Sequence, residues 1–522
     1  MEEPRLLITQ HPASVSGRLR VRIGVDIGGI NTIAVLMDQD QVATVATVAT
    51  TDDVVTGVGS VLGKLLDATD GRPDVLSVAI TTPQFADAIT SLKLTPTACV
   101  RLGPSDPGQV PPLAGWPDRV RRQIGEHIFL CDGGHEFDGR AIAAVNREQV
   151  LGVAEKIEQS RLTSAAVTSV FSTSRGGDEI EVASLLRERL PNVSICVSHE
   201  IGQFGLLERE NATIINAALL VVADTIVTGL DAAIRTLGFN APLYIARNDG
   251  TLMDSEYARN FPTATLASEV SHSLRGAALL AGVTDCVVIS VGRDETSIGA
   301  IVDGYPRRSG QWPLVAGVQT NLRMPLFARL PVGSGTVFDT ETAQPMSGTA
   351  EQLSPPAAVM SAHGEVRAWV SPTDETRVPT TFDTRCRDYV STLVSQVADG
   401  LRITHQAVPA VLVGAGSVIL PDELPGFELT IRPPHFEAAC AVGTAVAGIG
   451  GESERFYSRA AESRTTILSQ VHSIAVENAL LAGAADGTIQ VLEIDEVPVT
   501  YLPGDFHRIR VGVVGDLPAN PS

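Results

Sequence analysis

The sequence has little cysteine, few aromatic residues and a shortage of basic residues. Its six cysteines contain no C-x-x-C pair and are scattered at Cys99, Cys131, Cys196, Cys286, Cys386 and Cys440. This spacing excludes a disulfide framework and favours a reducing compartment with buried thiols. Lys and Arg total 39 against 60 Asp and Glu, a net charge of −21. Because such an acidic chain repels polyanions, we expect no nucleic-acid partner and no anionic membrane partner.

Long apolar runs are also missing. No uninterrupted apolar stretch reaches the roughly 18 residues that a membrane span needs. The first five residues, Met-Glu-Glu-Pro-Arg, do not combine a basic segment with an apolar core as a secretory signal does. With 44% hydrophobic and 19% charged residues, the composition is that of a globular protein. We therefore expect a soluble, cytoplasmic protein of several domain-sized units.

The most informative segment is an early strand–turn–strand pattern around two glycines. Gly28 and Gly29 follow Asp26 and precede Asn31 and Thr32. The two glycines remove side chains where the backbone must turn and expose its N–H groups. Such a loop can receive a phosphate on backbone donors, while the Asp26 carboxylate holds a hydrated Mg²⁺. An ordinary hairpin with a Gly-Gly turn is the alternative on these residues alone.

The same pattern recurs in the second half of the chain. Residues 287–304 again form an apolar run, a turn at Gly292, a second apolar run opened by Thr296, and an acidic-Gly turn. A duplicated phosphate-loop unit predicts two lobes with a nucleotide in the cleft between them.

A later apolar strand runs into the small residues Gly414, Gly416 and Ser417, which offer a further nucleotide contact. The third glycine of the dinucleotide fingerprint is absent, so we predict no NAD site.

The densest polar cluster of the first third is Gly-Gly-His-Glu-Phe-Asp-Gly-Arg, which contains His135, Glu136 and Asp138. One interpretation is a set of charged side chains fixed near a ligand, and the alternative is a solvated surface hairpin. The three residues lack a zinc spacing such as H-E-x-x-H. The run Glu208-Arg209-Glu210 has the composition of a solvated helix face.

Alternating strand and helix patterns over residues 20–200 predict an α/β domain with a boundary near residue 200. We divide the chain into a lobe at 1–200, a second lobe at 201–487 and a C-terminal β segment at 488–522. Within these we expect helices at 214–220, 438–449 and 468–485, strands at 489–497 and 509–514, and a loop at 350–376.

Together these blocks resemble the hydantoinase/oxoprolinase family, specifically its shorter, A-subunit-type members. The resemblance runs from about residue 21 to 516 and depends on eight blocks in family order. They are Asp26–Thr32, Gly133–Arg140, Gly205–Ala212, Asn248–Met253, Arg275–Ala278, Thr320–Pro325, Val413–Ser417 and Tyr501–Gly504. It makes 1–200 an N-terminal-type lobe and 201–487 a hydantoinase A-type lobe.

The resemblance implies an α/β fold of the two-lobed actin-like ATPase type, with RNase H-like sheets and ATP between the lobes. It implies ATP-dependent opening of a cyclic amide such as a hydantoin, 5-oxoproline or lactam. ATP would phosphorylate the amide oxygen and water would then attack the activated carbon. Mg²⁺ and backbone amides would orient and neutralise the transferred phosphoryl group. Implied partners are the small cyclic amide and a B-type or other subunit in a homo- or hetero-oligomer.

The residue roles follow from the same resemblance. Asp26 would organise Mg²⁺ and its water. Phosphate would lie on Gly28, Gly29, Asn31 and Thr32, with Gly292 and Thr296 as the second loop and Gly414, Gly416 and Ser417 lining the nucleoside pocket. His135, Glu136 and Asp138 are the candidates for substrate or metal contact.

The sequence departs from the family pattern at both phosphate loops. The first loop, usually D-x-G-G-T-N-T-D, has Ile30 and Ile33 in place of its first Thr and last Asp. In the second, both aspartates are serines, Ser290 and Ser297, and the turn contains Arg293, Asp294 and Glu295. The added acids oppose phosphate, although Arg293 can offset them. An Arg in place of Gly also restricts a turn that requires positive φ.

These departures support a second hypothesis. The chain would then be a catalytically impaired homologue that acts as a scaffold or regulatory subunit of an active partner. A sugar or acetate kinase of the same fold fits less well, because the cysteine-rich zinc motif of one sugar-kinase group is absent.

Overall fold

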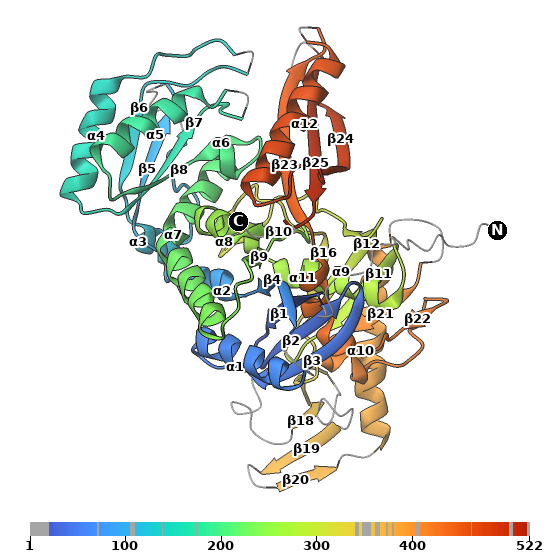
Figure 1. Ribbon diagram of the computed structural model, residues 1–522. Helices are drawn as coiled ribbons and strands as arrows, with labels where there is room; N and C mark the ends of the chain where they lie inside the picture. Colours follow the sequence, from blue (N-terminus) through green and yellow to red (C-terminus); the bar gives the residue numbers. More distant parts are fainter. Residues whose placement is uncertain are drawn as a thin grey trace.

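The computed structural model describes residues 20–518, apart from 70–72, 105–109, 138, 174, 340–343, 347–356, 361–365, 372–373, 378–379, 403–407, 461 and 501–504. The block at 501–504 and the candidate Asp138 therefore lie outside the described residues. Figure 1 shows the arrangement of the sheets and helices.

The largest sheet has nine strands in the order β24-β25-β23-β10-β9-β4-β1-β2-β3. The bounds are β1 Arg20–Ile27, β2 Asn31–Asp38, β3 Gln41–Ala49, β4 Asp74–Thr81, β9 Leu243–Ala246, β10 Leu252–Asp254, β23 Ile449–Ser458, β24 Gln490–Pro498 and β25 Phe506–Gly515. Strands from all three predicted segments thus share one sheet. The domain boundaries at residues 200 and 487 stay a prediction. In the structure, the three segments contribute neighbouring strands to the same sheet.

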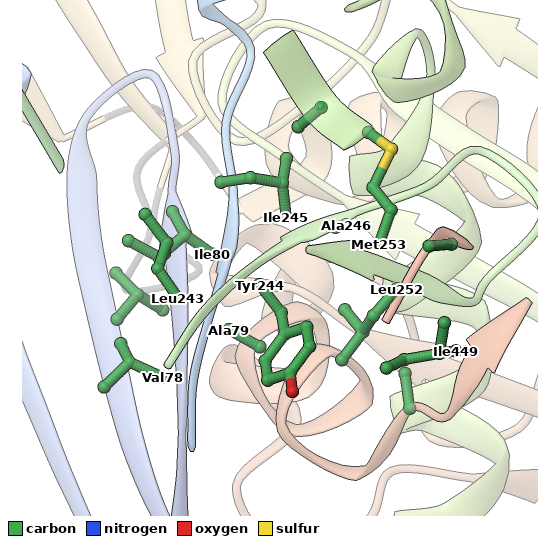
Figure 2. Close-up of a cluster of buried hydrophobic side chains, with 14 of the residues drawn as sticks. Val78, Ala79, Ile80, Leu243, Tyr244, Ile245, Ala246, Leu252, Met253 and Ile449 are labelled. Carbon is green, nitrogen blue, oxygen red and sulfur yellow. The ribbon is translucent and has the colours of Figure 1, made fainter. Parts of the chain in front are cut away.

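The centre of this sheet is an apolar cluster. Figure 2 shows side chains of β4, β9, β10 and β23 packed together, among them Val78, Ile245, Leu252 and Ile449. Runs of β-branched residues favour these strands because such side chains pack well on a pleated surface. Helices α1 (Val54–Asp67) and α12 (Arg464–Leu481) contribute apolar side chains to the same cluster.

A second sheet repeats the arrangement of the first. Its order is β13-β12-β11-β21-β22, with β16 also paired to β12. The bounds are β11 Cys286–Val291, β12 Thr296–Val302, β13 Tyr305–Pro306, β16 Phe327–Leu330, β21 Ala410–Val413 and β22 Thr430–Ile431. β11 pairs antiparallel with β12 and parallel with β21, as β1 does with β2 and β4. The predicted internal duplication is confirmed.

Helices α9 (Ser268–Ala281) and α11 (Ala439–Val446) join the two sheets, with α11 on β1 and α9 on β11 and β12. Glycine is required where they cross, because a Cβ on Gly443 would lie 2.0 Å from the His272 carbonyl oxygen. A Cβ on Gly24 of β1 would lie equally close, at 2.0 Å, to the Ala441 carbonyl oxygen. The two lobes therefore meet through direct backbone contact.

A separate four-stranded parallel sheet has the order β6-β5-β7-β8. Its strands are β5 Thr97–Leu102, β6 Ile128–Cys131, β7 Ser164–Ser169 and β8 Ser194–Val197. Helices α4 (Arg147–Gln159) and α5 (Gly177–Arg189) pack on one face. Helices α3 (Asp118–Ile124) and α7 (Leu206–Thr236) pack on the other face.

Helix α7 is much longer than the predicted 214–220, with 31 residues. Among the described residues it is the one helix long and apolar enough to cross a membrane by length and composition. Its apolar side chains are divided between two cores, with Ile214 and Leu219 under the four-stranded sheet and Val227 and Ile234 at the nine-stranded one. In the most apolar stretch of α7, 56% is buried inside the protein, which fits a core helix.

Two predictions were wrong. Arg209 and Glu210 are buried rather than solvated, because each has a buried polar partner, described below. The predicted loop at 350–376 contains β18 (Ala357–Met360), β19 (Val366–Ser371) and β20 (Asp374–Arg377), which pair with one another and with β17 (Val337–Asp339). Backbone pairing with neighbouring strands overrides a composition rich in Pro, Ser and Thr.

The predicted helix at 438–449 ends at Val446, since Ile449 already belongs to β23. The predicted burial of the cysteines is confirmed, because all six thiols are free and buried. The remaining elements are α2 (Gln84–Thr90), α6 (Ser198–Ile201), α8 (Ser255–Asn260), η1 (Pro262–Thr265), β14 (Leu314–Val315), β15 (Val318–Gln319), α10 (Thr380–Gly400), η2 (Ala415–Ile419) and η3 (Phe436–Ala438).

Candidate functional site

Asp26 lies at the end of β1, where the first sheet meets α9 and α11. Burial raises the pKa of Asp26 to about 6, against a hydrogen bond with the Cys440 thiol that lowers it. The negative charge of Glu269, in the first turn of α9, raises the pKa further. A carboxyl group perturbed by both burial and a specific charged neighbour is a functional-site candidate.

The first turn is held by its own backbone and by Thr50. The Gly28 N–H donates to the Asn31 carbonyl at 3.0 Å, and the Thr50 hydroxyl donates to the Gly28 carbonyl at 2.8 Å. The Thr32 hydroxyl is buried, 3.0 Å from the Thr50 Oγ1. Gly28 and Thr32 therefore fix the shape of the turn. A Cβ on Gly29 would meet nothing within 4 Å, so the space beside Gly29 is open.

The second turn has the same backbone geometry but is fastened by other segments. Its Gly292 N–H donates to the Glu295 carbonyl at 2.9 Å, and the Thr296 hydroxyl donates to the Val332 carbonyl at 2.6 Å. The Gly335 N–H donates to the Arg293 carbonyl at 2.7 Å. Neither turn contains a residue with positive φ, so the expected conformational cost of Arg293 does not arise.

The acids of the second turn are matched by arginines. Arg293 lies 3.7 Å from Asp294 at the exposed tip of the turn. Arg329 of β16 lies 3.4 Å from Glu295 and 2.7 Å from Glu269. Because Glu269 also acts on Asp26, Arg329 links the second turn to the first through charged neighbours. Each added acid therefore has an arginine beside it, and Glu295 shares Arg329 with Glu269.

Gly414, Gly416 and Ser417 lie directly against the second turn. A Cβ on Gly416 would be 2.5 Å from the Gly292 carbonyl oxygen, and Gly414 has a φ of 82°. Both glycines are thus explained by close packing and backbone conformation. The Ser417 Oγ is fully buried and has no hydrogen-bond partner within the described part of the chain. Their predicted contact with the nucleoside stays a prediction.

A metal ion at Asp26 would have few protein side chains as ligands. The described residues contain no group of three or more His, Cys, Asp or Glu side chains arranged to hold a metal ion. Asp26, with Glu269 nearby, fits Mg²⁺, which is commonly held by one or two carboxylates together with water and substrate phosphate oxygens.

His135 and Glu136 lie in the loop after β6 of the four-stranded sheet, which Figure 1 shows away from the β1–β2 hairpin. The His135 Nδ1 lies 3.4 Å from the Asp178 Oδ2, and the same oxygen accepts the Gly134 N–H at 2.7 Å. Glu136 lines a cavity at the end of this sheet. No contact among the described residues joins either side chain to Asp26, so the predicted site residues form two separate groups.

A buried polar network beside His135 was not predicted. The Glu179 carboxylate accepts the Ser169 N–H at 2.6 Å and the Ser198 hydroxyl at 2.5 Å, and lies 2.6 Å from the His199 Nδ1. Burial opposes both charges. The bonds and charges of the pair nevertheless lower the pKa of Glu179 and raise the pKa of His199. Arg209 donates to the Ser198 hydroxyl at 2.9 Å, which explains its burial.

Sequence reasoning also missed Glu269 and Arg329. Glu269 lies in the first turn of α9, outside the eight blocks that carry the family resemblance, and was therefore not singled out. Arg329 carries no local signal, because its two acidic partners are distant in sequence.

Comparison with known proteins decides the family. The hydantoinase/oxoprolinase N-terminal region matches residues 22–190, and the hydantoinase/oxoprolinase region matches residues 209–364. Together these matches cover more than half of the chain. The chain belongs to the hydantoinase/oxoprolinase family.

Individual relatives give the fold. The chain is 24% identical over 137 residues to the caprolactamase subunit alpha of Pseudomonas jessenii, a match of 26% of this chain and only 19% of that protein. The ATP-dependent caprolactamase structure from P. jessenii superposes with a TM-score of 0.72 at 14% identity, covering 96% of this chain and 88% of that one. Nucleotide-free acetone carboxylase gives 0.62 at 10% identity with the same coverage, 96% and 88%. With the duplicated topology, these likenesses confirm the predicted α/β, actin-like ATPase fold.

Proposed function

We propose that this chain is the ATP-using component of a hydrolase that opens a small cyclic amide. The observation that carries the proposal is the perturbed Asp26 carboxyl beside an open glycine turn, at the junction of two duplicated hairpins. Its fold is that of an ATP-dependent caprolactamase over 96% of its length.

The chemistry suits such a site. An amide carbonyl is a poor electrophile, and transfer of the γ-phosphoryl group of ATP to its oxygen activates the carbon. Water then adds to that carbon, the C–N bond of the ring breaks, and a second water releases phosphate. One cyclic amide, one ATP and two waters give the open amino acid, ADP and phosphate. The protein needs mainly to position the phosphates and neutralise their charge.

In this proposal each residue has a limited task. The open backbone at Gly29 and Asn31 receives phosphate, and Asp26 with Glu269 holds hydrated Mg²⁺, which neutralises phosphate charge when bound. Arg329 can leave its ion pair with Glu269 and bind a phosphate oxygen instead, because guanidinium groups bind carboxylates and phosphates with similar geometry.

A partner subunit forms part of the proposal. The matched relative is named as subunit alpha of caprolactamase. We expect the complete reaction to require a second chain, and ATP binding to be a property of this one.

The test is a Mg-ATP titration by calorimetry, followed by phosphate release with a panel of lactams, hydantoin and 5-oxoproline, with and without a co-expressed partner. We expect ATP binding by the isolated chain and substrate-stimulated phosphate release that Asp26→Asn abolishes. Absence of binding at millimolar Mg-ATP would overturn the proposal and leave a scaffold or regulatory role. Phosphate release that survives Asp26→Asn would place the chemistry elsewhere.

A further inference from the structure

The four-stranded sheet changes its winding direction between the adjacent strands β5 and β7. From β5 the chain passes through α3, on the α7 face, to β6. From β7 it passes through α5, on the opposite face, to β8. In open parallel sheets, ligands bind outside the carboxyl ends of two strands whose connections leave on opposite faces. The sheet therefore has a position for a ligand of its own, apart from the Asp26 turn.

A cavity of about 400 Å³ lies at this position. Arg101 of β5 and Val170, directly after β7, line it from the strand ends. Glu136 and Ile142 line it from the loop after β6, and Leu206 from the first turn of α7. Apart from Arg101 and Glu136, the side chains of the lining are apolar. The walls therefore suit a hydrocarbon body, and the two charged residues decide which polar group it can carry.

Arg101 is already neutralised by the protein. It is only 3% exposed, and two of its N–H groups donate to the Glu210 carboxylate, one at 2.8 Å. A third N–H donates to the Val110 carbonyl at 2.5 Å. An anionic ligand would have to break this buried ion pair in order to use the guanidinium, and breaking it would leave Glu210 as an uncompensated buried charge.

Glu136, by contrast, has an available carboxylate. Within the described residues, nothing forms an ion pair or hydrogen bond with this half-buried group. The loop that carries it is held in place, since the Glu136 N–H donates to the Arg140 carbonyl at 2.7 Å and the Ile142 N–H to the Gly134 carbonyl at 2.9 Å. The cavity thus presents a positioned acceptor with a negative charge.

The N-terminal end of α7 acts against a cation, because a helix carries partial positive charge there. The first turn of α7 contains Glu208, an acid that offsets this field. Together with the neutralised Arg101, this leaves the net charge around the cavity negative.

We propose that this cavity binds a primary ammonium group carried on a hydrocarbon chain. The ammonium donates to the Glu136 carboxylate, and the chain packs on the apolar walls. A carboxylate or phosphate in the same place is disfavoured, because Glu136 and the net charge of −21 repel it. The proposal goes beyond the reaction at Asp26 and does not depend on it.

Two sources can supply such a group. One is a free alkylamine that acts as an effector, and the other is a lysine of a partner subunit, whose side chain is an ammonium on a flexible hydrocarbon stem. Both place the same chemistry on Glu136. They differ in whether a bound partner subunit closes the cavity to a free amine.

The test is calorimetry of the full chain with hexylamine, hexanol and hexanoate, which share one hydrocarbon chain and differ in the charge of the end group. Hexylamine should bind roughly tenfold or more tightly than hexanol, since a hydrogen bond between charged partners is the stronger one. From butylamine to hexylamine, affinity should rise roughly fourfold for each added methylene that the apolar walls bury.

Four variants separate the two parts of the site. Glu136→Gln removes the negative charge and should weaken hexylamine binding roughly tenfold or more. Its matched control is Glu208→Gln, an acid of α7 that does not line the cavity. Ile142→Trp fills the cavity, and Ile180→Trp places the same side chain on the exposed surface of α5. Circular dichroism and thermal unfolding show whether each variant is folded.

The expected result is hexylamine binding that Ile142→Trp loses, Glu136→Gln weakens, and both control variants keep. Three results would overturn the inference: no binding of millimolar hexylamine, equal binding of hexanol or hexanoate, or binding that Glu136→Gln leaves unchanged. The same titration on the complex with a co-expressed partner subunit distinguishes the sources. Exclusion of hexylamine from the complex, with a weaker complex in Ile142→Trp, assigns the site to a lysine of the partner. Unchanged binding in the complex assigns it to a free amine.

Discussion

At the scale of single residues, the unusual feature is a carboxyl group that the fold holds in an unfavourable environment. Asp26 is packed beside Cys440 and the charge of Glu269, with a pKa of about 6 instead of 3.8. Keeping it ionised at neutral pH costs folding free energy in the absence of a cation. Sites that bind charged ligands commonly carry such a cost.

Asp26→Asn should therefore stabilise the protein while abolishing its function. A raised carboxyl pKa contributes stability that is present below the unfolded value of 3.8 and lost as pH rises through about 6. At pH 8 the variant should gain up to about 3 kcal/mol in free energy of unfolding, the equivalent of this pKa difference. Urea unfolding at pH 8 and pH 4 checks the prediction, which fails if the gain is equal at both.

Substitutions of Cys440 should move the pKa of Asp26 in opposite directions. The thiol bond lowers that pKa, so Cys440→Ala should raise it. Cys440→Asn offers a stronger N–H donor and should lower it. The pH dependence of substrate-stimulated phosphate release is the measurement. Shifts of the same sign in both variants would contradict the contact.

At the scale of elements, the two turns show why altered residues keep the fold. Both close with the same hydrogen bond, Gly28 to Asn31 and Gly292 to Glu295, and neither uses positive φ. The second turn therefore tolerates Arg293 and two acids. What the fold does not tolerate is bulk where α9 crosses α11.

Gly443→Ala should destabilise the junction of the lobes by about 3 kcal/mol or more, since its Cβ would meet backbone on α9. Gly59→Ala is the matched control. It lies in helix α1, where a Cβ would meet nothing within 4 Å. That change should stabilise by about 0.5–1 kcal/mol. Thermal unfolding of both variants is the measurement, and equal effects would refute the crossing contact.

At the scale of the whole molecule, the C-terminal strands complete a sheet that begins at residue 20. Val511 of β25 is fully buried under α12, whereas its paired neighbour Ile494 on the edge strand β24 is 48% exposed. The C-terminal β segment is therefore structural and cannot be treated as an appendage.

Val511→Asp should prevent stable folding, because an unpaired charge would be buried, at a cost above about 4 kcal/mol. Ile494→Asp, one strand away on the same face, should change stability by less than about 0.5 kcal/mol. Soluble yield and circular dichroism distinguish the two. A folded Val511→Asp protein would mean that β25 is dispensable.

Local pattern was sufficient for most strands and helices of the chain. The apolar runs on either side of Gly28 and Gly292 predicted two strand–turn–strand units, because these signals depend on neighbours in sequence. The same dependence on neighbouring residues explains the predictions that were wrong. A run such as Glu208-Arg209-Glu210 is judged solvated unless its partners are known, and Arg101 is 109 residues from Glu210.

The sequence by itself determined the duplicated hairpins, the acidic character, the family resemblance and Asp26 as the leading candidate. Only the tertiary structure decided which residues share a site. It placed Glu269, Cys440 and Arg329 near Asp26, and it placed His135 and Glu136 in a loop beside another sheet. The physical reason is that turns and strands form from local preferences, whereas a site forms from side chains whose proximity depends on the packing of whole sheets and helices.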